Sequence, residues 1–309
     1  MSYFCWCCWR RRRGAVDAGT VGKKDCDSAA VTCNVMSENG EAEGSKHIGR
    51  GESRRKSQVR AGPRPTKAGN RSRVLLELFT SQGCNSCPSA DWLISRLGKD
   101  EGEDVKLETP IPLVILAYHV DYWDYLGWKD PFASNAWTLK QRAYGDALRQ
   151  DRIYTPEIVV QGRSHSNANG NSIVALIQAA PRFPAPQVEA KFTRPSPLFL
   201  QIALRIGVKF KVEGYTLDVL LALHESGLVT DCKEGENRGK VLKNDYVVRG
   251  MHKACYLQDL PANKMASGEV TFSLWDGFST SNCGVALILQ NTDSKEVYAA
   301  QQLELPADI

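Results

Sequence analysis

The sequence has no long apolar run: no stretch approaches the ~18–20 uninterrupted apolar residues that a membrane-spanning helix needs. It also has no secretory signal of the usual form. In such a signal a basic end precedes an apolar segment, whereas here the aromatic and cysteine-rich residues 1–9 precede the arginine run at 10–13. We therefore expect a reducing compartment and a cytoplasmic location. The ten cysteines are unevenly spaced, which argues against the disulfide framework of a small secreted protein.

Aromatic residues are absent between Arg10 and Arg73, where small and charged residues predominate. Such a segment cannot bury enough apolar surface to offset the conformational entropy that folding would cost. Acidic residues are also scarce there: residues 1–73 hold 16 Lys and Arg against 7 Asp and Glu, whereas the rest of the chain holds 23 against 28. We expect residues 1–72 to form a disordered basic tail, and the acidic balance of the remainder excludes an obvious nucleic-acid surface.

Three cysteines, Cys5, Cys7 and Cys8, lie beside the arginines at 10–13. One interpretation is S-acylation, with the arginines contacting anionic lipid, which would give peripheral membrane contact through the tail. The alternatives are a solvated end with incidental cysteines, or a targeting segment such as a nuclear signal.

Ordered structure is expected from Arg73, because residues 74–79 form a nearly continuous apolar run that is typical of a strand buried on both faces. Helix and strand patterns then alternate, with a helix over 90–97, a strand over 112–119, a helix over 135–149, a strand over 157–161 and a helix over 172–180. This order predicts an α/β domain over residues 73–180, with helices covering a sheet.

Five of the chain's 14 prolines fall within residues 181–197, which predicts a Pro-rich linker. Residues 198–309 then show short β-rich runs separated by turn residues, without helical periodicity. We expect these runs to form a small antiparallel β-sandwich as a separate domain.

A Cys-x-x-Cys motif, Cys84 to Cys87, stands where the first buried strand meets a helix. Unsatisfied N–H groups and the helix dipole at such a position stabilise a thiolate, the species that attacks disulfides. The second cysteine, one turn further on, could displace the product. Pro88 suits the first helical turn because it lacks an N–H.

The same pair could be half of a zinc site or two unreactive buried thiols. Zinc requires two further ligands at comparable spacing. The remaining downstream cysteines are isolated from one another, and no histidine pair accompanies them. We predict neither a metal ion nor a cofactor.

Thr155 and Pro156 directly precede the third predicted strand. An ordinary turn would have a trans bond, since only ~5–6% of X–Pro bonds in folded proteins are cis. In thioredoxin-like folds, however, a cis-proline at this place faces the dithiol, and the residue before it can pair with an incoming peptide backbone. The order of motifs therefore favours a cis bond and a substrate-binding role for both residues.

Residues 118–132 hold six aromatic residues and three aspartates. His119 lies at the end of a predicted strand, where open α/β sheets gather their sites. On a functional interpretation, His119 or Asp121 accepts a proton from the buried cysteine and Trp123 helps to line a substrate groove. The alternative is that the aromatics pack a helix onto the sheet while the aspartates cap turns.

Residues 76–88, 119–132 and 154–156 together resemble an uncharacterised thioredoxin-like family whose members are commonly secreted and are described only as a domain of unknown function. The turn at 235–240 and residues 247–249 resemble the same family's β-rich part. The resemblance covers about residues 73–305 and implies a thioredoxin-like fold with a dithiol site, without a substrate. Gly83, Asn85 and Ser86 depart from thioredoxin, so the redox direction stays open.

The leading hypothesis is a thiol–disulfide oxidoreductase in which Cys84 attacks and Cys87 resolves, acting on a protein or small-molecule disulfide with an unidentified redox partner. A redox-inactive binding or scaffold module is the main alternative, and a buried Cys84 or a trans bond before Pro156 would favour it. A third is a carrier of a soft metal ion such as Cu(I).

Overall fold

The computed structural model describes residues 71–99 and 110–309. The expected tail and the cysteines proposed for acylation, Cys5, Cys7 and Cys8, lie outside these ranges. No helix in the described ranges is long and apolar enough to cross a membrane.

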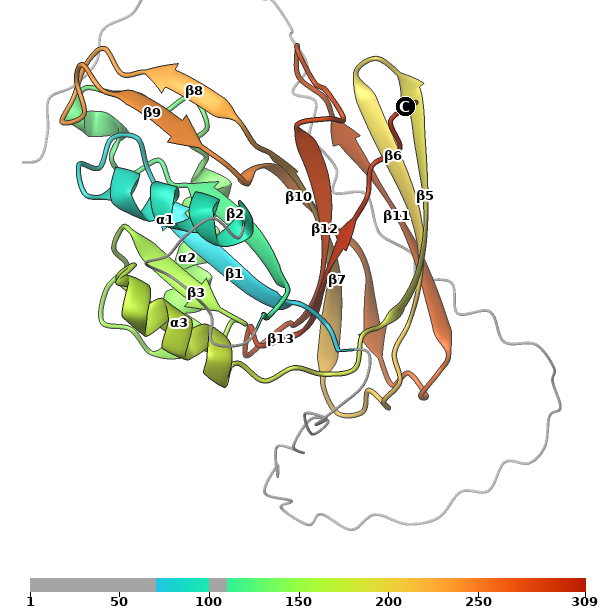
Figure 1. Cartoon of the computed structure of the whole chain (residues 1–309). Helices are drawn as coiled ribbons and strands as arrows, with labels where there is room; N and C mark the ends of the chain where they lie inside the picture. Colours follow the sequence, from blue (N-terminus) through green and yellow to red (C-terminus); the bar gives the residue numbers. More distant parts are fainter. Residues whose placement is uncertain (1–70, 100–109) are drawn as a thin grey trace, which may run out of the picture. The chain divides into compact units, whose positions relative to one another are not determined.

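The first half of the described chain mixes strands and helices (Figure 1). Its elements are β1 (Val74–Thr80), α1 (Cys87–Lys99), β2 (Leu113–His119), the short 3₁₀ helix η1 (Asp124–Leu126), α2 (Asn135–Leu148), β3 (Glu157–Val160), β4 (Ser164–Ser166) and α3 (Gly170–Ala179). Both β1 and β2 are buried almost along their whole length, as their apolar runs predict.

The second half contains only strands in the described structure. They are β5 (Gln187–Ser196), β6 (Phe199–Gly207), β7 (Thr216–Glu225), β8 (Leu228–Asp231), β9 (Val241–Asn244), β10 (Val247–Gln258), β11 (Met265–Ser273), β12 (Cys283–Asn291) and β13 (Val297–Leu303). Within the range expected to be a linker, β5 pairs with β6 along most of its length.

One eight-stranded mixed sheet joins the two halves, in the order β13-β12-β7-β10-β2-β1-β3-β4. The joint is the parallel pairing of β2 with β10, where Ala117 aligns with Val247. The Ala117 N–H donates to the Tyr246 carbonyl at 2.8 Å. The strands of the first half therefore continue into those of the second.

The expected fold class, an α/β thioredoxin-like domain followed by a separate small β-sandwich, is wrong. Strands make up 42% of the described residues and helices only 17%, and the principal sheet is shared between the two halves. The apolar pattern of 112–119 shows that this strand is buried on both faces, but it carries no information about which strand lies beside its edge. That neighbour, β10, comes more than 120 residues later in the chain.

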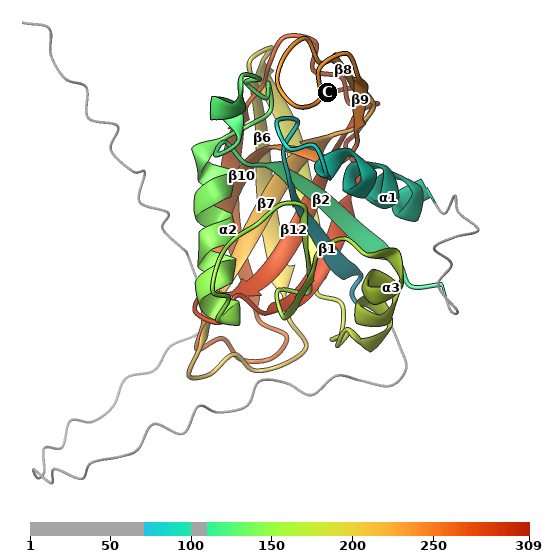
Figure 2. The ribbon, with the colours of Figure 1, turned by 90° about the vertical axis from the view of Figure 1, so that its left-hand side faces the viewer.

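Helices cover both faces of the sheet near β1 and β2. Figure 2 shows α2 on one side of these strands, and α1 and α3 on the other. The α2 side forms a core that includes Phe79 of β1, Tyr144 of α2 and Ile288 of β12, so α2 packs across the joint between the halves. Burial of these large side chains on both halves contributes to holding the halves together.

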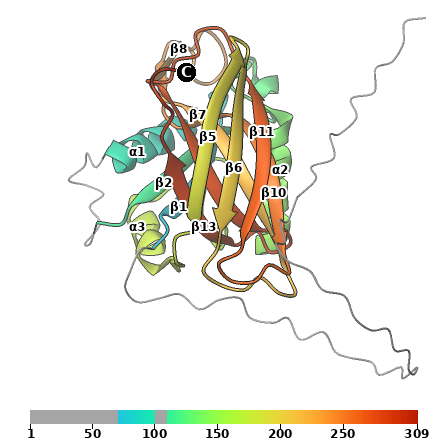
Figure 3. The same cartoon turned by 90° about the vertical axis from the view of Figure 1, so that its right-hand side faces the viewer.

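A second, three-stranded sheet has the order β11-β6-β5 (Figure 3). Its inward side chains, such as Leu200 and Ile202, share a buried core with Leu221 of β7 and Leu287 of β12. The strand-on-strand packing expected for this half is therefore present, but one of its two layers belongs to the eight-stranded sheet.

A buried carboxylate, Glu77 of β1, lies under α2. It accepts hydrogen bonds from the hydroxyl groups of Tyr118, at 2.9 Å, and Tyr144, and pairs with the ammonium group of Lys140 at 3.1 Å. Gln290 of β12 donates in turn to the Tyr144 hydroxyl at 2.8 Å. These partners offset the cost of burying the charge and connect strands of both halves through α2.

Because the two halves share a sheet and a core, the described residues should unfold as one unit. We expect differential scanning calorimetry of the chain to show a single transition for the folded part, with equal calorimetric and van't Hoff enthalpies. A fragment ending at residue 197 should lack a cooperative transition, since it loses β10 and the rest of the shared sheet. Two separate transitions, or an independently folded fragment, would contradict this arrangement.

Candidate functional site

The two cysteines of the Cys-x-x-Cys motif lie where β1 ends and α1 begins. Cys87 is the first residue of α1, and the turn before it is closed by a hydrogen bond from the Cys84 N–H to the Ser81 carbonyl at 3.2 Å. Both are free thiols; Cys84 is 3% exposed and Cys87 is fully buried. The Cys84 sulfur lies 3.3 Å from Ser86 Oγ and 3.9 Å from the Thr155 carbonyl oxygen.

The environments of the two sulfurs shift their pKa values in opposite directions. The pKa of Cys84 is lowered from 9.0 to about 5, chiefly by a hydrogen bond from the Cys87 thiol. Burial opposes this change, and hydrogen bonds from Ser86 and Thr155 add to it. Burial raises the pKa of Cys87 well above its ordinary value, and the neighbouring Cys84 raises it further. The pair thus consists of a thiolate and a neutral thiol that donates to it.

The bond between Thr155 and Pro156 is cis, as the sequence predicts, and it directly precedes β3. The indole N–H of Trp123 donates to Thr155 Oγ1 at 2.7 Å. The position of Trp123 also accounts for the glycine at residue 83. A Cβ at Gly83 would lie 3.1 Å from both the Cβ and the carbonyl oxygen of Trp123, which leaves little room for a side chain. The structure therefore brings Trp123 and Thr155 together beside the cysteine turn.

His119 is fully buried, and its Nδ1 lies 2.7 Å from Asp130 Oδ2. Burial disfavours the charged imidazole, but the Asp130 carboxylate outweighs it and raises the pKa of His119. Asp121 accepts a hydrogen bond from Thr138 Oγ1 at 2.6 Å. Among the described interactions, neither His119 nor Asp121 contacts Cys87, so the geometry does not place them as its direct proton acceptors.

Asp91 is a site residue that the sequence analysis missed. It lies one helical turn after Cys87 in α1, is buried, and accepts a hydrogen bond from Thr80 Oγ1 at 3.0 Å. Burial raises the pKa of Asp91 from 3.8 to about 7, against the opposing influence of His119. The Asp91 charge in turn raises the pKa of Cys87. The four-residue spacing between Cys87 and Asp91, which places both on one helix face, is the signal that could have found it.

The cysteine turn is also held from the second half of the chain. Gln82 Nε2 donates to Asn244 Oδ1 at 2.8 Å and to Thr230 Oγ1 at 3.0 Å, and both partners belong to the β8–β9 hairpin. The Trp128 indole donates to Gln82 Oε1 at 3.2 Å. No local sequence pattern predicts the contacts of Gln82 with the hairpin, because they join residues roughly 150 positions apart.

A cavity of about 410 Å³ lies between α1 and this hairpin. Its walls include Pro88, Asp91 and Trp92 from α1, and Val229 and Val241 from the hairpin. Asp91 is therefore within reach of solvent that enters the cavity, which allows it to exchange a proton. Within residues 71–99 and 110–309, no group of three or more His, Cys, Asp or Glu side chains is arranged to hold a metal ion.

Comparison with known proteins gives a matching family and several similar solved structures. The family described as "Protein of unknown function (DUF1223)" matches residues 75–290. Protein AGR_C_4864 from Agrobacterium tumefaciens is 26% identical, with a TM-score of 0.52 over 76% of this chain and 96% of that one. HBP35 of Porphyromonas gingivalis, at 15% identity, shares the fold with a TM-score of 0.55 over 77% of each chain. A search of curated proteins finds no match.

The raised pKa of Asp91 predicts how stability depends on pH. The folded protein binds a proton more tightly than the unfolded chain between pH 3.8 and about 7, so this group's contribution to stability is lost as the pH rises through that range. Relative to wild type, Asp91→Asn should therefore gain stability from pH 4 to 7, by up to about 4 kcal/mol. Urea unfolding at several pH values measures this, with the exposed Asp151→Asn as control. A stability difference that does not change with pH would contradict the assignment.

Proposed function

Because the chain belongs to the family described as "Protein of unknown function (DUF1223)", whose description assigns no reaction, we propose a function from its own residues: thiol–disulfide exchange at Cys84 and Cys87. The observation that carries the proposal is the geometry of two free cysteines at the start of α1, with the Cys84 sulfur 3.3 Å from Ser86 Oγ and 3.9 Å from the Thr155 carbonyl oxygen. The lowered pKa of Cys84 and the raised pKa of Cys87 support it. The substrate class is a disulfide, in a protein or a small molecule.

In the first step, the Cys84 thiolate attacks one sulfur of the substrate disulfide. A bond forms between Cys84 and that sulfur, the substrate S–S bond breaks, and the second substrate sulfur leaves as a thiolate that takes a proton from solvent. Cys84 is ionised at neutral pH because its pKa is about 5, so no separate base is required for this step.

In the second step, Cys87 must lose a proton before it can attack. Asp91 lies one helical turn from Cys87, and its charge raises the pKa of that thiol; its own pKa of about 7 leaves a large ionised fraction at neutral pH, so we assign it as the proton acceptor. The Cys87 thiolate then attacks the Cys84 sulfur, the Cys84–Cys87 disulfide forms, and the bound substrate sulfur leaves as a thiolate. The substrate gains two electrons and the dithiol is oxidised; a second dithiol partner restores it.

The proposed substrate position is beside Thr155 and Pro156. The Thr155 carbonyl is 3.9 Å from the Cys84 sulfur, close enough for an extended substrate backbone to pair with this segment during attack. Trp123, which donates to the Thr155 side chain, would form one wall of the groove. The chemistry is thioredoxin-like at the level of these groups, on a different overall fold.

The rival proposal is a redox-inactive binding module, and the observation that favours it is the burial of Cys84. A sulfur on a residue that is only 3% exposed is poorly accessible to a large substrate. On the oxidoreductase proposal, the groups that cover Cys84 must move when the substrate binds. The cis bond before Pro156 and the low pKa of Cys84 favour the oxidoreductase.

An equilibrium redox titration, read by alkylation mass shift, tests this proposal. We expect a reversible two-electron couple that Cys84→Ser abolishes and Cys283→Ser, a control outside the site, retains. A low thiolate pKa stabilises the reduced form, so the potential should lie above thioredoxin's, about −270 mV, and toward DsbA's, about −120 mV. A pair that never oxidises, or a Cys84 that alkylates no faster than an ordinary thiol, would favour the binding module.

The assignment of Asp91 can be tested separately from that of Cys84. With a small aromatic disulfide as substrate, Asp91→Asn should leave the first attack nearly unchanged and slow resolution by Cys87 roughly 10²-fold, so that the mixed disulfide accumulates. Asp121→Asn is the matched control, because it removes a carboxylate that follows β2 and does not share a helix face with Cys87. Equal rates of resolution in Asp91→Asn and wild type would remove Asp91 from the mechanism.

A further inference from the structure

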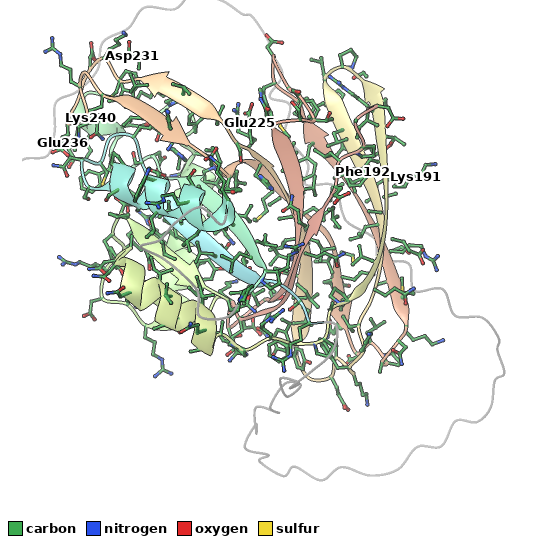
Figure 4. The ribbon with its side chains drawn as sticks, viewed as in Figure 1. Lys191, Phe192, Glu225, Asp231, Glu236 and Lys240 are labelled. Atoms are coloured by element: carbon green, nitrogen blue, oxygen red, sulfur yellow. The ribbon has the colours of Figure 1, made fainter. Side chains whose placement is uncertain are left out.

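A loop of the β8–β9 hairpin is the second-half segment that contacts the cysteine turn most directly. In the sequence, this hairpin comes between β7 and β10, which are neighbours in the shared sheet. Its loop contains residues 235–240, to which the sequence alone assigns no role. Figure 4 labels Asp231, Glu236 and Lys240 at the end of the hairpin, beyond the start of α1.

Asn237 is the buried centre of this loop. It is fully buried, and its Nδ2 donates to the carbonyl oxygens of Gln82, at 2.8 Å, and Cys84, at 2.9 Å. Its Oδ1 accepts from the ammonium group of Lys240 at 2.9 Å. Both ends of the amide are thus used, one end on the cysteine turn and the other within the loop.

The loop is built to present this amide. Gly239 N–H donates to the Cys232 carbonyl at 2.8 Å, and Cys232 N–H donates to the Lys240 carbonyl at 3.0 Å, which closes the loop at its base. Gly235 has a φ of +71°, and a Cβ there would lie 2.9 Å from Trp128 Cβ. A glycine is therefore required for the loop to pass this close to the aromatic segment after β2.

We infer that Asn237 is a positioning residue for Cys84, fixing the backbone that sets the reactivity of its sulfur. The inference rests on the proposed thiol–disulfide chemistry. Carbonyl oxygens carry partial negative charge, and the carbonyls of Gln82 and Cys84 belong to the turn that carries the nucleophile; the Cys84 carbonyl also accepts from the Cys87 N–H at 3.4 Å. Asn237 binds both oxygens, so its amide fixes the backbone conformation of the turn and with it the position of the Cys84 sulfur.

The side chain of Gln82 gives the turn a second attachment to the same hairpin, through Thr230 and Asn244. The turn is therefore fixed by its backbone and by a side chain, both from residues far along the chain. A rigid support of this kind is what a preorganised nucleophile requires.

The experiment is the pH dependence of Cys84 alkylation in the full chain. Asn237→Ala should raise the midpoint by about one unit, a tenfold weaker stabilisation of the thiolate, and lower the reduction potential by about 30 mV. Lys240→Met, which removes the hydrogen bond that orients the amide together with the ammonium charge, should shift the midpoint in the same direction by less. Glu236→Ala, a neighbouring exposed residue, is the control and should match wild type.

An unchanged midpoint in a folded Asn237→Ala would overturn the inference and leave the oxidoreductase proposal intact if the redox couple persists. Absence of any couple in wild type would instead overturn the proposed function, while the alkylation midpoint would still report on Asn237. If Asn237→Ala does not fold, Lys240→Met decides, because Lys240 is exposed; a wild-type midpoint in that variant would then overturn the inference.

Discussion

The pairing of β2 with β10 is the interaction on which the rest of the structure depends. It turns two runs of strands into one sheet, and it places the β8–β9 hairpin, which precedes β10, beside the end of β1 where the cysteines lie. The α2 helix then packs over strands from both sides of the joint. Without this pairing the dithiol would keep its helix start but lose Gln82's partners and the Asn237 amide.

Two sets of contacts determine the properties of the site. Within the first half, the hydrogen bond from the Cys87 thiol lowers the pKa of Cys84, and burial raises the pKa of Cys87. From the second half, the hairpin fixes the backbone around Cys84. The contacts within the first half explain why the two sulfurs differ in pKa. The contacts from the hairpin explain how the turn between β1 and α1 keeps one conformation.

The sequence predicts the local features of the molecule well and the long-range ones poorly. The strand at 74–79, the dithiol at the start of a helix and the cis bond before Pro156 follow from apolar runs, motif order and residue chemistry. The shared sheet could not be predicted, because a strand's pattern reports its burial and not its neighbour. Asp91 was predictable from helical spacing, whereas Asn237 was not, since its partners lie about 150 residues away.

The long separation between Asn237 and Cys84 has a consequence for synthesis. Ribosomes extend the chain from its N-terminus, so both cysteines are made 150 or more residues before the amide that fixes their turn. During that interval β2 also lacks its β10 neighbour, and the turn around Cys84 is not yet supported from the hairpin. The contacts from the hairpin that hold the turn around Cys84 can therefore form only after synthesis has passed residue 237.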